Sequence, residues 1–253
     1  MQTIINGLLT HYEIVNPKAK NPVIILHGWG SSSSYWAPLT GKLPSDHVYY
    51  LIDLPSFGGT QNLQSSPDVP DYTDFVKSFI EKLKLKKITL VGHSFGGQIT
   101  IDFSIKYPKV LNKIVLIAPA GIRHRTPITR MKIALTKTIK PLLKLVSPKI
   151  QKQILALYTP KDYQNANPHQ RSVLNNILKY NLENSLRQIT VPTHIIWGSE
   201  DHVIPYKGKF MADNIKNSRL HVIYGAGHLI HLSHPDKLVN ILNPIITSSL
   251  RGT

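Results

Sequence analysis

The sequence contains no cysteine, which excludes disulfides, thiolate nucleophiles and cysteine-ligated metal sites. It also lacks any apolar run approaching the ~18 residues of a membrane-spanning helix. Its first 15 residues, MQTIINGLLTHYEIV, have neither a basic leader nor a small-residue cleavage site, so no secretory signal peptide is expected. Together these absences predict a soluble, cytoplasmic protein.

Acidic residues are scarce. The 253 residues include only 14 Asp and Glu against 30 Lys and Arg, a formal net charge of +16. Between Asp102 and Asp162 there are 13 Lys or Arg and no acidic residue. Such a surface attracts anions, whether nucleic acid, acidic lipid or a charged substrate. No nucleic-acid-binding motif accompanies the charge, so we expect no specific nucleic-acid partner and favour a basic proteome or general solubility as its explanation.

The chain does contain enough apolar sequence for a large core, since hydrophobic residues make up 42% of it. After a hairpin expected around Asn6-Gly7, short apolar runs alternate with segments of helical periodicity. Strands buried on both faces and alternating with helices predict a parallel sheet flanked by helices. The predicted strands are 22–26, 48–53, 87–92, 113–118, 193–198 and 219–223, and the predicted helices are 34–43, 71–85, 95–107, 206–216 and one from about 235.

Two local features complete this prediction. Asp71 stands where the helix 71–85 begins and is a candidate N-cap. The regular alternation stops after residue 118, and the next 75 or so residues have helical periodicity interrupted by prolines. We interpret that stretch as a helical insertion rather than a separate domain.

Ser94 is a candidate nucleophile. It lies in Gly92-His93-Ser94-Phe95-Gly96, between a predicted strand and a predicted helix. A serine on a sharp strand-to-helix turn has its hydroxyl held out of the sheet, and the flanking glycines let neighbouring backbone pass close to it. The alternative is a small residue in a structural turn, and the strand–turn–helix context favours the nucleophile.

A serine hydroxyl needs a base to remove its proton, and the base needs a carboxylate to orient it. His228 follows the strand 219–223, and Asp201 follows the strand 193–198. Both therefore belong to the carboxyl edge of the sheet, where open α/β sheets build their sites. Glu200 is the rival of Asp201. The developing oxyanion needs backbone donors, for which we predict the N–H groups of Phe95 and, in the loop HGWG, of Trp29.

Three further histidines, His221, His231 and His234, lie close to His228. Their spacing could suggest zinc, but no acidic residue with ligand-like spacing joins them, and a serine nucleophile leaves zinc no task. We expect no metal and no cofactor. We interpret His231 and His234 as surface or capping residues before the last helix.

The stretches ILHGWG, LIDLPSFGGT, LVGHSFGG, IIWGSEDHVIP and GAGH together resemble the α/β-hydrolase superfamily, in its capped single-domain branch. The resemblance implies an α/β fold with a mostly parallel central sheet of about eight strands. It divides the chain into a core over 1–120 and 190–253 and a helical cap over 121–189, inserted after the sixth strand. The order Ser94, Asp201, His228 is the one this family uses.

The same resemblance carries one departure: Ser56 in DLPSFGGT stands where the family usually has glycine, which leaves only that turn in doubt. Asp53 in the same loop is interpreted as structural. The family's haloalkane dehalogenases and epoxide hydrolases have aspartate at the position of Ser94. Serine there implies acyl transfer by way of an acyl-enzyme, hence a carboxylesterase acting on small to medium acyl chains, with lactonase activity as an extension.

Two alternatives stay open. The same triad could serve C–C hydrolysis or aminopeptidase chemistry, with Arg123, Arg125 or Arg130 holding a substrate carboxylate. Leu229 weakens the C–C option, because family members with that activity often carry tryptophan after the catalytic histidine. The other alternative is a weakly catalytic ligand-binding protein.

The expected cap sets specificity in such a fold. Its apolar residues, among them Met131, Leu135 and Leu142, either pack the cap onto the core or line an acyl pocket. Its basic, amphipathic character leaves open a weak contact with anionic membrane surfaces. The oligomeric state is not encoded in any pattern we recognise.

Overall fold

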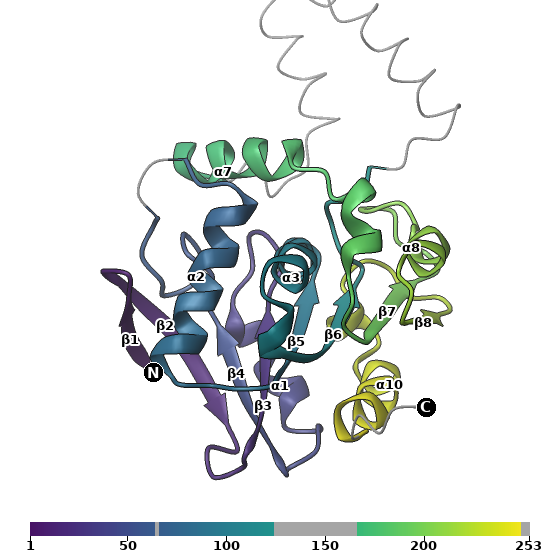
Figure 1. Ribbon diagram of the computed structural model, residues 1–253, viewed down its shortest axis with the longest axis horizontal. Coiled ribbons are helices and arrows are strands. Elements are labelled where there is room, and N and C mark those ends of the chain that lie inside the picture. The colour runs from purple at the N-terminus through teal and green to yellow at the C-terminus, as the bar shows by residue number, and fades with distance from the viewer. Residues whose placement is uncertain (64–65, 124–165, 249–253) are drawn as a thin grey trace, which may run out of the picture.

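The computed structural model describes residues 1–63, 66–123 and 166–248. Within them eight strands form one sheet in the order β1-β2-β4-β3-β5-β6-β7-β8 (Figure 1). The strands are β1 (Gln2–Ile5), β2 (Leu8–Val15), β3 (Asn21–Leu26), β4 (His47–Ile52), β5 (Ile88–His93), β6 (Leu111–Ile117), β7 (Thr193–Gly198) and β8 (Ser218–Ile223). The pairs β1–β2 and β2–β4 are antiparallel, and the other neighbours are parallel. The predicted mostly parallel α/β sheet of about eight strands is confirmed.

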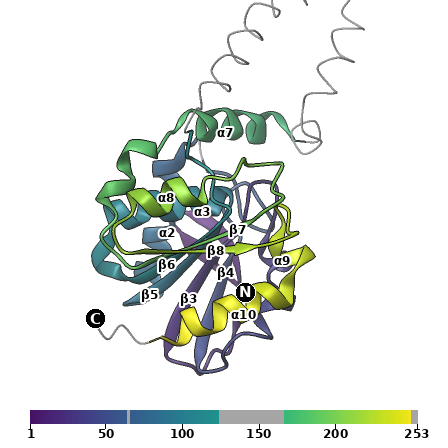
Figure 2. The same ribbon diagram turned by 90° about the vertical axis from the view of Figure 1, so that its right-hand side faces the viewer.

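Helices cover both faces of this sheet. Figure 2 shows α2, α3 and α8 on one side and α9 and α10 on the other. The helix α7 lies across one end, at the top of Figure 1. The α-helices in the described ranges are α1 (Ala37–Thr40), α2 (Val69–Lys82), α3 (Phe95–Lys106), α7 (Pro168–Lys179), α8 (Gly208–Asn214), α9 (Ile230–Ser233) and α10 (Pro235–Thr247).

The two faces of the sheet bury two separate cores. In β3, Ile24 and Leu26 pack with α2 and α3, whereas Val23 and Ile25 pack with α1 and α10. This alternation follows from the two-residue period of a strand. Because both faces are covered, side chains on both faces of such a strand are mostly apolar, which explains the short hydrophobic runs of the sequence.

The start of α2 differs from the prediction. Asp68, not Asp71, is the N-cap, so that prediction was wrong. The Asp68 side chain accepts the Asp71 N–H at 3.4 Å, and the Asp71 side chain accepts the Asp68 N–H at 2.8 Å. Asp71 is thus the third residue of a capping box. Pro70 fits in the first turn because that turn needs no N–H from it.

The insertion follows β6, the sixth strand, as predicted. Of the predicted cap range 121–189, the structure describes 121–123 and 166–189, which contain α7 and a 3₁₀ helix, Glu183–Gln188. Five of the singled-out residues lie outside the described ranges: Arg125, Arg130, Met131, Leu135 and Leu142. No helix in the described part of the chain is both long and apolar enough to cross a membrane.

Candidate active site

Ser94 joins the end of β5 directly to the start of α3. Its backbone has φ 53°, in the left-handed region that residues other than glycine rarely adopt. The Ser94 N–H donates to Ile117 O at 3.0 Å, and Ser94 O accepts from the amides of Gln98 and Ala120 at 3.0 and 2.9 Å. Hydrogen bonds on both sides hold this strained residue in place, and such strain concentrates at functional sites.

The glycines beside Ser94 are required by close backbone contacts. A Cβ on Gly92 would lie 2.3 Å from Gly96 O, and one on Gly96 would lie 2.4 Å from Leu26 O. Real side chains do not tolerate such distances. The turn can therefore form only with glycine at both positions.

Asp201 and His228 form a hydrogen-bonded pair. Asp201 Oδ2 lies 2.8 Å from His228 Nδ1, and Asp201 Oδ1 accepts the N–H groups of Val203 and Ile204 at 2.9 Å. Because an ionised carboxylate can only accept, His228 Nδ1 carries the proton and Nε2 is left as an acceptor. Burial favours a higher pKa for Asp201, but the bonds from His228 and the two amides outweigh it and hold that pKa below its ordinary value. The rival acid, Glu200, is exposed.

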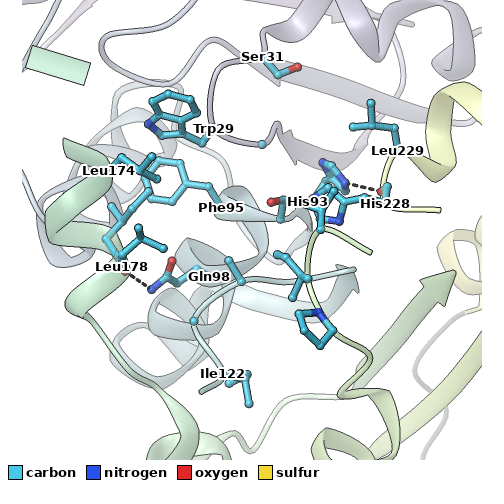
Figure 3. Close-up of a pocket in the computed structure, with 18 of the residues that line it drawn as sticks. Trp29, Ser31, His93, Phe95, Gln98, Ile122, Leu174, Leu178, His228 and Leu229 are labelled. Carbon is cyan, nitrogen blue, oxygen red and sulfur yellow. Dashed lines mark hydrogen bonds between the residues drawn. The ribbon is translucent and has the colours of Figure 1, made fainter. Parts of the chain in front are cut away.

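Ser94 and His228 line the same cavity, of about 410 Å³, as do Trp29 and Phe95 (Figure 3). Asp201 stands behind His228 and is buried. Most of the remaining wall is apolar. It includes Ile122, Leu174, Ile177, Leu178, Val203 and Leu229.

Two buried histidines that the sequence analysis did not single out support the site. His93 Nε2 lies 3.0 Å from His228 O, and a carbonyl only accepts, so His93 donates. His27 Nε2 accepts the Leu54 N–H at 3.0 Å, so His27 Nδ1 donates to Gly28 O at 2.7 Å. Burial lowers the pKa of both histidines and keeps them neutral. His93 thus ties the His228 loop to the Ser94 turn, and His27 fixes the HGWG loop.

His231 corrects a prediction. It is 4% exposed rather than a surface or capping residue, and it lines the cavity. Its ring stacks on Trp36 with centroids 4.4 Å apart and planes at 9°. Stacking on Trp36, which is distant in the sequence, buries the imidazole of His231. The sequence around His231 contains no pattern that predicts this contact. Burial, and then the nearby His228, lower the pKa of His231 to about 4.

His221, His234 and Asp53 lie away from the cavity. His221 pairs with His194 across β7 and β8 at 3.2 Å, and His234 precedes α10 without a side-chain capping bond. Asp53 has the structural role predicted for it, since its carboxylate accepts the N–H groups of Ser33 and Gly59 at 2.6 and 2.8 Å. Where the structure describes side chains, no group of three or more His, Asp or Glu is arranged to hold a metal ion.

Several known proteins resemble this chain in sequence or in fold. Monoacylglycerol lipase ABHD6 of Homo sapiens is 26% identical over 261 residues, covering 92% of this chain and 77% of the lipase. An esterase from Exiguobacterium antarcticum has the same fold, with a TM-score of 0.76, 22% identity and coverage of 98% of this chain and 100% of its own. So does an enol-lactonase from Burkholderia xenovorans LB400, with a TM-score of 0.74, 18% identity and coverage of 98% and 100%. A model of the alpha/beta hydrolase family matches residues 23–241. The match spans most of the sequence, and the chain therefore belongs to the alpha/beta hydrolase family.

Proposed function

We propose that the protein is a serine hydrolase that cleaves carboxylic esters of small to medium acyl chain, with lactones as a related class. Ser94 is the nucleophile, His228 the general base and Asp201 the group that orients the base. One observation carries the proposal. A strained serine and a histidine held by a buried carboxylate line one cavity.

In this mechanism His228 Nε2 takes the Ser94 proton while Ser94 Oγ attacks the ester carbonyl. His228 then gives the proton to the leaving alcohol, and an acyl-enzyme remains. A water then gives a proton to the same Nε2 as it attacks the acyl carbon, and His228 returns that proton to Ser94 Oγ when the acid leaves. Asp201 keeps His228 in the required tautomer and stabilises its charged form.

The proposed oxyanion donors are the N–H groups of Phe95 and Trp29. Phe95 is the first residue of α3, so its N–H has no acceptor within the helix. The loop that carries Trp29 comes very close to the nucleophile, because a Cβ on Gly28 would lie 3.3 Å from Ser94 Cβ. Losing one such donor typically costs about 3–4 kcal/mol of transition-state stabilisation.

The ester class is supported by the cavity and by the relatives. Its volume of about 410 Å³ is toward the lower end of the range of roughly 300–1,000 Å³ for small-molecule pockets. Its mainly apolar wall suits an acyl chain. The similar proteins named above are a lipase, an esterase and a lactonase, all of which act on ester bonds.

A panel of p-nitrophenyl esters of rising chain length, with a lactone and an amide, tests the proposal. Ser94→Ala and His228→Ala should each lower kcat by more than about 10³-fold while the circular dichroism spectrum is kept. Ser31→Ala, a serine that also lines the cavity, is the matched control and should keep activity within a few fold. A fluorophosphonate should label the wild type and not Ser94→Ala. Absence of both turnover and labelling in the wild type would reject the proposal.

Arg123 also lines the cavity, which supports a second candidate, cleavage of a C–C bond in a substrate that carries a carboxylate. Adding a vinylogous diketone acid to the panel separates the two. Faster turnover of that acid than of any ester would favour the C–C hydrolase.

A further inference from the structure

The loop after β4 contains a second strained serine. Phe57 N–H donates to Leu54 O at 3.0 Å, Pro55 takes the second position of the turn, and Ser56 takes the third with φ 75°. This is the pattern of a type II turn, whose third position favours glycine. Ser56 therefore bears a conformational cost that glycine would avoid.

Ser56 holds the start of α7. Its hydroxyl is hydrogen-bonded to His169 Nε2 at 3.0 Å, and its carbonyl accepts from Gln170 Nε2 at 3.1 Å. His169 and Gln170 belong to the first turn of α7, more than 100 positions away in the sequence. Ser56 itself is buried, whereas His169 and Gln170 are half-buried, so these bonds are partly shielded from water.

The far end of α7 is held by the helix that carries the nucleophile. Gln98 lies one turn after Ser94, and its Nε2 donates to Ile177 O and Tyr180 O at 3.0 and 2.9 Å. Between these two attachments, α7 turns Leu174, Ile177 and Leu178 toward the cavity. Polar contacts with the core therefore hold both ends of α7, the helix that forms this apolar wall.

The chemistry assigns this wall to the acyl group. The leaving oxygen must come within hydrogen-bonding reach of His228 Nε2, because that atom returns the proton to it. The acyl chain then extends away from His228. Figure 3 shows Leu174 and Leu178 on one side of the cavity and His228 with Leu229 on the other.

Building on the proposed function, we propose that α7 is the wall that receives the acyl chain, and that Ser56 is the positioning residue that fixes this wall and thereby sets acyl-length selectivity. Ser56 touches no substrate. It acts through His169 and Gln170, and its hydroxyl is the group that glycine could not supply.

Two substitutions at one position separate the role of the hydroxyl from that of the backbone. Ser56→Ala and Ser56→Gly both remove the bond to His169, but only glycine also relieves the left-handed backbone. Selectivity is measured as kcat/KM for the preferred p-nitrophenyl ester divided by kcat/KM for an ester four carbons longer. Both variants should lower this ratio by about fivefold, which corresponds to the loss of one hydrogen bond. The change should appear in KM, with kcat for the acetate unchanged. Ser56→Ala should melt at a lower temperature than Ser56→Gly.

His169→Ala should reproduce the selectivity change from the other side of the bond. Lys84→Gly is the control, because it relieves a left-handed residue (φ 53°) at the opposite end of α2 and should leave selectivity as in the wild type. An unchanged chain-length profile in both Ser56 variants would overturn the proposal.

Hydrogen exchange of residues 168–179 gives a readout that does not depend on turnover. Exchange should be faster in Ser56→Gly and in Ser56→Ala than in the wild type. If the wild type cleaves no ester, the proposed function fails, and this measurement still decides whether Ser56 holds α7. Equal exchange rates in all three proteins would show that it does not.

Discussion

At the scale of single residues, hydrogen bonds of fixed direction orient three histidine rings near Ser94, those of His228, His93 and His27. Asp201 requires a proton on Nδ1 of His228, and the carbonyl of His228 requires one on Nε2 of His93. His27 is fixed in the same way by the Leu54 N–H. Buried polar groups that are paired in this manner resist reorientation, because each alternative leaves a donor or an acceptor unsatisfied. His228 is therefore held in the tautomer that the proposed general base needs before any substrate arrives.

Replacing Asp201 tests this directly. In Asp201→Asn the side-chain amide can donate to His228 Nδ1, which favours the wrong tautomer, with the proton on Nε2. We expect kcat for a p-nitrophenyl ester to fall by a factor on the order of 10⁴, with the fold intact. Glu200→Gln alters the exposed neighbouring acid and should keep kcat within about twofold. A large loss in Glu200→Gln with little loss in Asp201→Asn would reverse the assignment of the acid.

At the scale of elements, the unit formed by β5, Ser94 and α3 positions the proposed nucleophile. The helix can approach the sheet only because Gly92 and Gly96 leave room for neighbouring backbone. The same helix holds α7 through Gln98. One helix therefore helps to set the position of Ser94 and, through Gln98, the position of α7.

Gly92→Ala should disrupt this unit. Its Cβ would lie 2.3 Å from both Gly96 O and Thr100 Oγ1, so α3 must shift. We expect a loss of more than about 3 kcal/mol in the free energy of unfolding, measured by urea denaturation. Gly41→Ala is the control, because its Cβ would meet its nearest neighbour, Pro38 O, at 3.9 Å. Its stability should stay within about 0.5 kcal/mol of the wild type.

At the scale of the whole molecule, the charge balance and the buried histidines govern the response to solution conditions. The net charge of +16 favours anionic partners, and the weak contact with anionic membrane surfaces stays a prediction. His231 and His194 are both held neutral, since burial, with smaller contributions from neighbouring groups, lowers each pKa to about 4. Lowering the pH below 6.5 therefore destabilises the folded state, at pH values above those at which the carboxylates are protonated.

The sign of the pH effect follows from His231. The pKa of His231 has an ordinary value of 6.5 and is about 4 in the folded protein. As the pH falls, His231 is therefore protonated in the unfolded chain before it is protonated in the folded protein. Stability is complete above pH 6.5 and is lost progressively toward pH 4, by up to roughly 3 kcal/mol for this residue. His231→Phe keeps a ring against Trp36 and should flatten that slope in urea titrations. If the free energy of unfolding changed equally with pH in both proteins between pH 4 and 6.5, the assignment would be contradicted. Between pH 7 and 8 the slopes of the two proteins should agree.

The sequence by itself determined the sheet, its two-sided burial and the place of Ser94. Those features depend on local patterns: unbroken apolar runs for strands covered on both faces, and glycines on either side of a serine where a strand meets a helix. Asp201 and His228 were proposed on similar grounds, since each lies in the loop that follows a strand.

Only the tertiary structure decided the supporting contacts. His93 bonds to a carbonyl 135 positions away, and Ser56 bonds to a ring 113 positions away. A histidine or serine in a loop carries no local mark of such a partner, which is why His231 was misplaced and Ser56 was read only as an unusual turn residue. Periodicity depends on residues that are close in the sequence. The partner of a buried polar group depends on which distant segments pack against it in the folded protein.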